Sequence, residues 1–486
     1  MRKISLLFAA LMTTATIAWA QVGTLTVRAK GEIERTASGF DFLYGDTTSF
    51  IVKQCVSGFF IGMKESHELV RYDMNLNEQK RSTMTLPPNF RYITGFDNKE
   101  VVDILLTKRD EDNKLTVYHD KFSATTLEPI GEPVTIASLT GEKTDNLVFI
   151  SRQSPDKQLT AGIFVTKREG QAAEARVSLY DRHLEEYWTM STRLNVVDFA
   201  SVTDSGEVII GGWLQQKVTG KSDFEIIVLD GENNRTYHFT VDAGTLAEVD
   251  FANYHDGKLY FFAIGRKKGS RNTGWSDADR VISICYNTIS DQATLDSHSF
   301  SEDELDYMNN HGDFRGTSSS ELRFLGIDNM VAAPDGHYDV LLTQTWKMVG
   351  DINAGVCSGI MIATVKPDGT IKRVYTRPYA ILAAQAYVNM KKYRMVRANG
   401  GSLLLYSQNE KNIDRKFSKK AKKLTYGSDL AVLTAIFVPD EGEIREQHFD
   451  NGGYNLMGSP IALSDGRFLL FLRTNKKLQS AIFSLQ

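Results

Sequence analysis

The stretch Ile461-Ala-Leu-Ser-Asp465-Gly466, which continues into Arg467-Phe-Leu-Leu-Phe-Leu472, decides the fold of this chain. Two mainly apolar runs flank an Asp-Gly pair, and this pair tolerates the positive φ angles that a tight hairpin turn requires. The stretch therefore predicts two antiparallel strands joined by a short turn.

Copies of this hairpin recur at irregular intervals along the chain. The clearest copies have their turn glycines at Gly206, Gly257, Gly336, Gly400 and Gly466. A variable loop, a third strand, a second turn and a fourth strand are expected after each of the first four. Weaker copies in the first half pair residues 50–53 with 59–63, 92–93 with 101–106, and 147–150 with 161–165.

A four-stranded unit of this size cannot bury both of its faces alone, and stacking such units in a ring buries them. The last copy has only three strands before the end, at residues 460–464, 467–473 and 480–485. Residues 24–28 can supply the missing strand and close the ring. We therefore predict an all-β chain, a single β-propeller of eight four-stranded antiparallel blades, with seven blades as the alternative because the first copy is poorly marked.

Residues 1–20 have the pattern of a secretory signal peptide. Arg2 and Lys3 precede an apolar core at residues 4–17, and Ala18-Trp19-Ala20 matches an A-x-A cleavage site. A buried N-terminal helix is the alternative. No cysteine follows the site, so a lipid anchor is not expected, and no later stretch is apolar enough to span a membrane. We expect residues 21–486 to form one exported domain in the periplasm, on the outer surface or outside the cell.

The charge balance argues against a nucleic-acid partner. The chain has 56 Lys and Arg and 60 Asp and Glu, for a net charge of −4, whereas nucleic-acid binding draws on a basic surface. Cys55, Cys285 and Cys357 are too few for a disulfide framework. They are interpreted as three buried thiols, with one optional disulfide as the alternative.

The longest irregular segments follow the second strand of a unit or connect two units, and both kinds of connection lie on the same face of a propeller. They are residues 266–279, 301–322, 346–356 and 408–428. Because long loops on a rigid scaffold are common binding sites, we expect one functional face, built mainly by the later blades. Its candidate binding residues are Trp213, Arg266, Trp275, Tyr307, His311, Trp346, Arg415, Lys419 and Lys420. The tryptophans fit a recognition surface, or each caps its own blade.

Two runs of charge fall in these segments. Residues 411–423 are basic, and Glu302, Asp303, Glu304, Asp306 and Asp313 form an acidic run. Either run is typical of a solvated, mobile loop. As binding features, the basic run would dock phosphorylated glycolipid headgroups or an acidic polymer, and the acidic run would bind Ca²⁺ or a basic partner.

The sequence lacks the motifs of catalysis and of cofactor binding. We find no H-E-x-x-H zinc motif, no G-x-S-x-G nucleophile elbow, no C-x-x-C pair, no phosphate loop and no EF-hand. Asp boxes of sialidases and the repeat marks of WD40 and Kelch propellers are also missing. No catalytic, cofactor or metal residue is therefore assigned, although paired carboxylates of a glycosidase need no sequence motif.

Several stretches resemble a group of exported β-propeller proteins of Bacteroidota that has no assigned activity. They are residues 177–181 running on to Tyr187-Trp188, 327–336, 362–369 and 404–412, together with the Ala20-Gln21 junction. The resemblance runs from about residue 175 to the end of the chain. It implies the propeller fold and a location in the cell envelope, and it assigns no role to any residue.

Two hypotheses of function follow. The first is a non-enzymatic binding or scaffold protein whose loop-rich face binds an envelope protein or a glycan. The alternative is a carbohydrate-active enzyme, a glycosidase or lyase, with carboxylates around the central channel. A third possibility is an assembly subunit whose partner supplies the activity. The sequence leaves the oligomeric state open.

Overall fold

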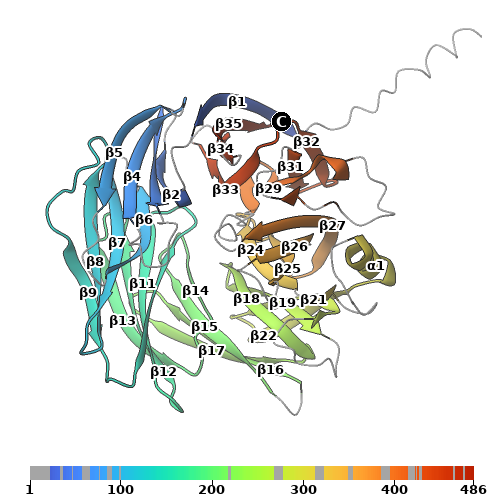
Figure 1. Cartoon of the computed structure of the whole chain (residues 1–486). Coiled ribbons are helices and arrows are strands. Elements are labelled where there is room, and N and C mark those ends of the chain that lie inside the picture. Colours follow the sequence, from blue (N-terminus) through green and yellow to red (C-terminus); the bar gives the residue numbers. More distant parts are fainter. Residues whose placement is uncertain are drawn as a thin grey trace, which may run out of the picture.

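In the computed structural model the strands form a closed ring of eight antiparallel sheets (Figure 1). The structure describes residues 22–32, 37–45, 48–56, 66–75, 77–84, 90–97, 100–216, 220–266, 277–311, 322–323, 325–347, 354–384, 395–413, 422, 424–425, 430–463, 466–473 and 477–486. The fold is an eight-bladed β-propeller, as predicted, and the alternative of seven blades is wrong.

Blades are numbered here in chain order, and each begins with its innermost strand. The first four blades are β2 (Ala37–Gly45), β3 (Ser49–Val56), β4 (Ser66–Asp73) and β5 (Glu78–Met84); β6 (Phe90–Asp97), β7 (Val101–Arg109), β8 (Lys114–Ser123) and β9 (Val134–Thr140); β10 (Asn146–Gln153), β11 (Leu159–Lys167), β12 (Ala173–Asp181) and β13 (Glu186–Leu194); and β14 (Phe199–Val202), β15 (Val208–Gln215), β16 (Ser222–Leu229) and β17 (Asn234–Val241).

The later blades carry additional short elements. Blades 5 to 8 are β18 (Thr245–His255), β19 (Lys258–Arg266), β21 (Arg280–Asn287) and β22 (Gln292–Ser299); β24 (Leu325–Ala332), β25 (Tyr338–Lys347), β26 (Ala354–Val365) and β27 (Ile371–Ala384); β28 (Met395–Ala398), β29 (Gly401–Asn409), β31 (Ala431–Pro439) and β32 (Arg445–Phe449); and β33 (Asn455–Ala462), β34 (Phe468–Arg473), β35 (Lys477–Leu485) and β1 (Gly23–Glu32). The additional elements are β20 (Asp277–Ala278), α1 (Glu302–His311), β23 (Leu322–Arg323), the 3-10 turn η2 (Glu410–Asn412) and β30 (Leu424–Thr425).

The two ends of the chain close the ring in blade 8, as predicted. Strand β1 pairs antiparallel with β35, from Gly23 opposite Leu485 to Glu32 opposite Lys477. Oε1 of Gln447, in the outermost strand of blade 7, accepts hydrogen bonds from the backbone N–H groups of Val22 and Gly23 at 2.7 and 3.1 Å. The first strand of the ring is therefore held by the last two blades.

Hydrophobic side chains are buried between blades. Among the described residues they form eight clusters, and each cluster draws on two neighbouring blades. Between blades 4 and 5, for example, the ring of Phe239 stacks on Phe224 at 4.8 Å and on Tyr286 at 4.3 Å between centroids. Because each blade is covered on both faces by its neighbours, the closed ring needs no other layer.

Two expectations about local structure change, and the interpretation of Cys285 as a buried thiol is confirmed. The acidic run at residues 302–306 forms the helix α1 and is not a mobile loop, while Asp313 lies outside the described residues. In blade 1, β3 pairs with β2 and β4, and the partner segment expected at 59–63 is outside the described part. Cys285 is a buried free thiol, and burial raises its pKa; the side chains of Cys55 and Cys357 are not described.

Residues 1–20, the expected signal peptide, also lie outside the described part of the chain. Within the part that is described, no helix is long and apolar enough to cross a membrane.

Candidate functional site

The connections between strands differ in length from blade to blade on one face of the ring. In blades 2 and 3 the second and third strands are joined by residues 110–113 and 168–172. In blades 5 and 7 the corresponding connections are residues 267–279 and 410–430. We call this side the loop-bearing face and the opposite side, which carries the hairpin turns, the turn-bearing face.

Helix α1 lies on the loop-bearing face, in the connection between blades 5 and 6. Ser301 and Glu304 form a capping box: the Glu304 N–H donates to the Ser301 hydroxyl at 3.2 Å, and the Ser301 N–H donates to Oε2 of Glu304 at 2.8 Å. Leu305 and Met308 are buried against the core of blades 5 and 6. Glu302, Asp303 and Asp306 are exposed, so the helix turns an acidic side to solvent.

An arginine–glutamate pair lies beneath α1, between blades 6 and 7. Arg377 of β27 contacts Oε1 of Glu446 of β32 at 3.0 Å, and the Tyr375 hydroxyl donates to Oε2 of Glu446 at 2.8 Å. Tyr307 of α1 is half-buried; burial raises its pKa, and the nearby Arg377 partly offsets that rise. These contacts link α1 to β27, and they link β27 in turn to blade 7.

Two residues near the ends of the basic run, Asn412 and Lys422, are hydrogen-bonded to each other. The side-chain amide of Asn412 donates to the Lys422 carbonyl at 3.0 Å and accepts from the Lys422 N–H at 2.8 Å. Strand β30 then pairs in parallel with the end of β27, with Leu424 opposite Ile381. Strand β27 therefore has the acidic helix as one neighbour and β30, which follows the basic run, as another, so α1 and the described ends of the basic run lie on one face.

Inner strands of blades 5 and 6 bring carboxylates together at the centre of the ring. Oε2 of Glu248 in β18 accepts a hydrogen bond from the Ile327 N–H of β24 at 3.2 Å. Burial raises the pKa of Glu248 to about 7; this hydrogen bond acts to lower it, and the charges of Asp250 and Asp328 act to raise it. Near neutral pH this carboxyl group can therefore donate or accept a hydrogen bond.

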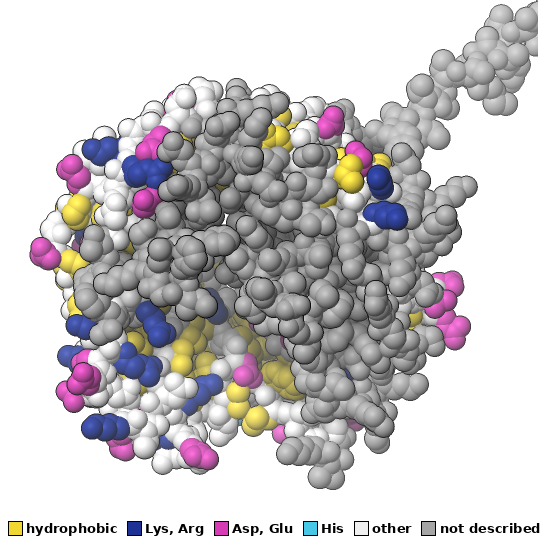
Figure 2. All heavy atoms as spheres, in the orientation of Figure 1, with side chains coloured by type: hydrophobic (Ala, Val, Ile, Leu, Met, Phe, Trp, Pro, Cys, Tyr) yellow, Lys and Arg dark blue, Asp and Glu magenta, His cyan; other side chains and the backbone are white. Residues whose placement is uncertain are grey.

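Asp250 has the surroundings expected for a channel wall. Its side chain reaches water, yet burial by the surrounding protein raises its pKa, and the charge of Arg152 from blade 3 partly offsets that rise. Nε of Arg152 donates to the Ala200 carbonyl of β14 at 3.2 Å. A hollow with hydrophobic and charged side chains is visible near the centre of the ring in Figure 2.

The structure describes the side chains of three of the nine predicted binding residues, and it does not join them into one cluster. Trp213 is half-buried at the end of β15 and packs on the core of blades 4 and 5, which supports the capping interpretation. Arg266 is half-buried at the end of β19, and Tyr307 is half-buried in α1. The side chains of His311 and Trp346, and residues Trp275, Arg415, Lys419 and Lys420, are outside the described part.

Sequence reasoning did not identify Arg152, Glu248, Asp250 and Asp328 as candidates. Two of them could have been noticed in the sequence. Glu248 and Asp250 are acidic residues in a strand whose other residues include Leu246, Val249 and Phe251. Among the described residues, no group of three or more His, Cys, Asp or Glu side chains has the arrangement of a metal site.

Neither a known family profile nor a curated protein matches this chain. Solved structures similar to it include prolyl oligopeptidase B from Galerina marginata, at 8% identity and a TM-score of 0.39 over 89% of this chain. The chain spans only 55% of the length of that enzyme. The WD40 domain of SCAP from fission yeast is similar at 8% identity and a TM-score of 0.35, over 94% of this chain and 98% of that one. Similarity at this level carries no argument about activity.

Proposed function

We propose that this protein is an exported, non-enzymatic binding or scaffold protein of the bacterial cell envelope, and that the loop-bearing face of blades 5 to 7 binds a protein or glycan partner. The observation that supports this proposal most strongly is the difference in connection length between blades. Blades 2 and 3 close with short connections, whereas blades 5 and 7 carry residues 267–279 and 410–430 on the same face. Since short connections suffice in blades 2 and 3, a binding role explains the additional length of these connections.

Charge on this face supports a partner with polar or charged groups. The exposed side of α1 is acidic, and the basic run at 411–423 is followed by β30, which pairs with β27. Phosphorylated or acidic glycans fit the basic run, and a protein with patches of both signs fits the two runs together. The location in the envelope rests on the pattern of residues 1–20 and on the resemblance to exported propellers of Bacteroidota.

An affinity-capture experiment tests this proposal. The mature chain is immobilised, and binding is measured to an envelope extract and to a glycan array. Capture should weaken when Trp275→Ala or the double charge reversal Lys419→Glu with Lys420→Glu is introduced. The matched control Glu232→Lys changes an exposed charge on the turn-bearing face and should leave capture unchanged.

Two outcomes contradict the proposal. Capture that survives every change on the loop-bearing face means that another surface binds. Turnover of a glycan that is lost in Glu248→Gln means that the channel carboxylates catalyse a reaction and that the protein is an enzyme.

A further inference from the structure

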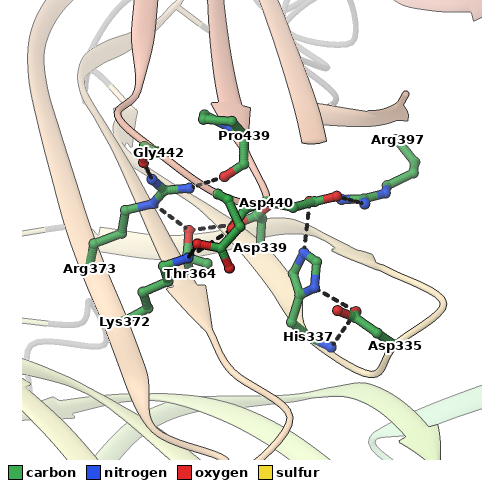
Figure 3. Close-up of polar contacts among 11 residues, drawn as sticks. Asp335, His337, Asp339, Thr364, Lys372, Arg373, Arg397, Pro439, Asp440 and Gly442 are labelled. Atoms are coloured by element: carbon green, nitrogen blue, oxygen red, sulfur yellow. Dashed lines mark hydrogen bonds and ion pairs between the residues drawn. The ribbon is translucent and has the colours of Figure 1, made fainter. Parts of the chain in front are cut away.

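A network of polar contacts joins blades 6 and 7 on the turn-bearing face (Figure 3). His337 lies in it, at the end of the turn between β24 and β25, and only 10% of its side chain is exposed. Its Nδ1 atom lies 2.6 Å from Oδ1 of Asp335, and its Nε2 atom lies 3.0 Å from Oδ1 of Asp440 in blade 7. Each ring nitrogen therefore faces a carboxylate.

Both carboxyl groups are held in the ionised form. The two Nη atoms of Arg397 donate to the oxygens of Asp440 at 2.8 and 2.6 Å. Partial burial acts to raise the pKa of Asp440, but Arg397 and the charge of His337 outweigh it, and the net shift is downward. At Asp335, partial burial is likewise outweighed by the hydrogen bonds and charge of His337, so its pKa is lowered. Ionised carboxylates only accept hydrogen bonds.

The protonation state of the imidazole ring decides whether both contacts can form. A neutral ring has one N–H donor and one acceptor nitrogen, whereas an imidazolium has two donors. With a neutral ring, one of the two contacts would oppose a lone pair to a carboxylate oxygen. We infer that His337 joins blades 6 and 7 as an imidazolium, and that loss of its ring proton breaks one of its two carboxylate contacts and loosens this joint.

Other contacts across the joint do not depend on His337. The Lys372 ammonium donates to the Asp440 carbonyl at 2.8 Å. Arg373 donates to the Gly442 carbonyl at 2.7 Å and to the Pro439 carbonyl, both in blade 7, and it also donates at 3.2 Å to the Thr364 hydroxyl of its own blade. Because Lys and Arg stay charged throughout the range in which histidine titrates, deprotonation loosens the joint and does not separate the blades.

The titratable and charged groups around His337 come from three blades. They are Asp335, Asp339, Lys372 and Arg373 of blade 6, Arg397, Asp440 and Glu441 of blade 7, and His255 of blade 5. Burial raises the pKa of Asp339, which accepts a hydrogen bond from Thr364 at 2.6 Å. His255 packs on the turn, since a Cβ atom at Gly336 would lie 2.5 Å from its Cδ2 atom. His255 is the second titratable imidazole near the joint and needs its own control.

Hydrogen exchange in the mature protein tests the inference. Protection factors, which correct for the pH dependence of chemical exchange, are measured for the backbone amides of residues 333–338 and 440–442 at pH 5.5 and pH 8.5. Loss of one charge-assisted hydrogen bond should lower wild-type protection about tenfold or more at the higher pH. His337→Gln, which is neutral at both pH values, should lose this pH response, and the control His255→Gln should keep it.

A second variant covers the case in which His337→Gln fails to fold. Asp335→Asn replaces one carboxylate by an amide that can donate or accept, so a neutral ring can satisfy both neighbours and the pH response should disappear. Wild-type protection that is equal at the two pH values overturns the inference. A pH response that survives in Asp335→Asn, or that is lost in His255→Gln, also overturns it.

Discussion

Blades 2 and 3 and blades 5 to 7 are built from the same four-stranded sheet, and both groups bury their apolar side chains against neighbouring blades. They differ on the loop-bearing face. Blade 2 joins its second and third strands with residues 110–113, whereas blade 7 uses residues 410–430 and adds η2 and β30. The short version shows that a blade of this ring can join these two strands with few residues. The long connections add a few buried side chains, such as Ala278 and Leu424, and the proposed function assigns partner binding to their additional length.

The largest expected effect on stability concerns the apolar core between neighbouring blades, which both groups of blades share. Phe261 in β19 is fully buried and packs with Phe199, Phe224 and Phe251. Phe261→Ala leaves a cavity between blades 4 and 5 and should lower the free energy of unfolding by about 3–5 kcal/mol in chemical denaturation. Ile289→Ala, at a side chain that is 84% exposed, should change it by less than about 0.5 kcal/mol. Equal effects of the two substitutions would contradict the claim that the apolar core between blades stabilises the ring.

A smaller effect on stability is expected at Glu248, in the innermost strand of blade 5. Folding raises the pKa of Glu248 from 4.5 to about 7, so the folded state keeps a proton that the unfolded chain releases, and stability falls as pH rises through this range. Gln is never charged and keeps an oxygen that can accept from Ile327. Glu248→Gln should therefore be more stable than wild type by on the order of 1–3 kcal/mol at pH 8, with little difference at pH 4.

The control for that measurement is Glu232→Gln, at an exposed position on the turn-bearing face. It should show no such pH dependence. A loss of stability in Glu248→Gln at pH 8 would mean that the charge of Glu248 is compensated in the channel.

The next effect concerns the helix that only the later blades carry. Ser301→Ala removes the hydroxyl that caps the first turn of α1 and should cost about 1 kcal/mol of stability. Chemical unfolding of this variant is compared with Ser299→Ala, an exposed serine at the end of β22. If the two variants are equally stable, the capping box does not hold α1 on the ring.

The smallest expected effect on stability comes from the long connection of blade 5. Replacing residues 268–275 by half as many Gly and Ser residues should change the free energy of unfolding by less than about 0.6 kcal/mol, since the whole connection is shortened by less than half. Capture of the partner should nevertheless be lost, because the segment includes Trp275. A large loss of stability would show that this connection supports the fold, and the comparison between the blades would then fail.

Much of the fold could be predicted from turn chemistry. Gly206, Gly257, Gly336, Gly400 and Gly466 all have positive φ, between +69° and +90°, as the tight turn of a hairpin requires. Ring closure was also predictable, since the last copy of the repeat lacks one strand. Both inferences use local pattern and the need to bury each sheet.

Helix α1 was missed for a local reason. It has only 10 residues, and Leu305 and Met308 give too short an apolar pattern to stand out among charged neighbours. Its start was nevertheless marked, because Ser301 and Glu304 have the spacing of a capping box.

The polar sites could not be predicted, because they join residues far apart in the sequence. His337 and Asp440 are separated by 103 positions, and Glu248 and Ile327 by 79. Their proximity depends on the number of blades and on the register of each strand. Neither can be read from one sequence with irregular spacing between repeats.

Site-specific photo-crosslinking in cells tests the central claim most directly. A photoreactive residue is placed at Asp303 or Asp306 on the exposed side of α1, and at Glu232 or Ile289 on the turn-bearing face; all four positions are exposed. Binding through the loop-bearing face predicts covalent adducts from the first pair and none from the second. Adducts formed only from Glu232 or Ile289 would contradict it.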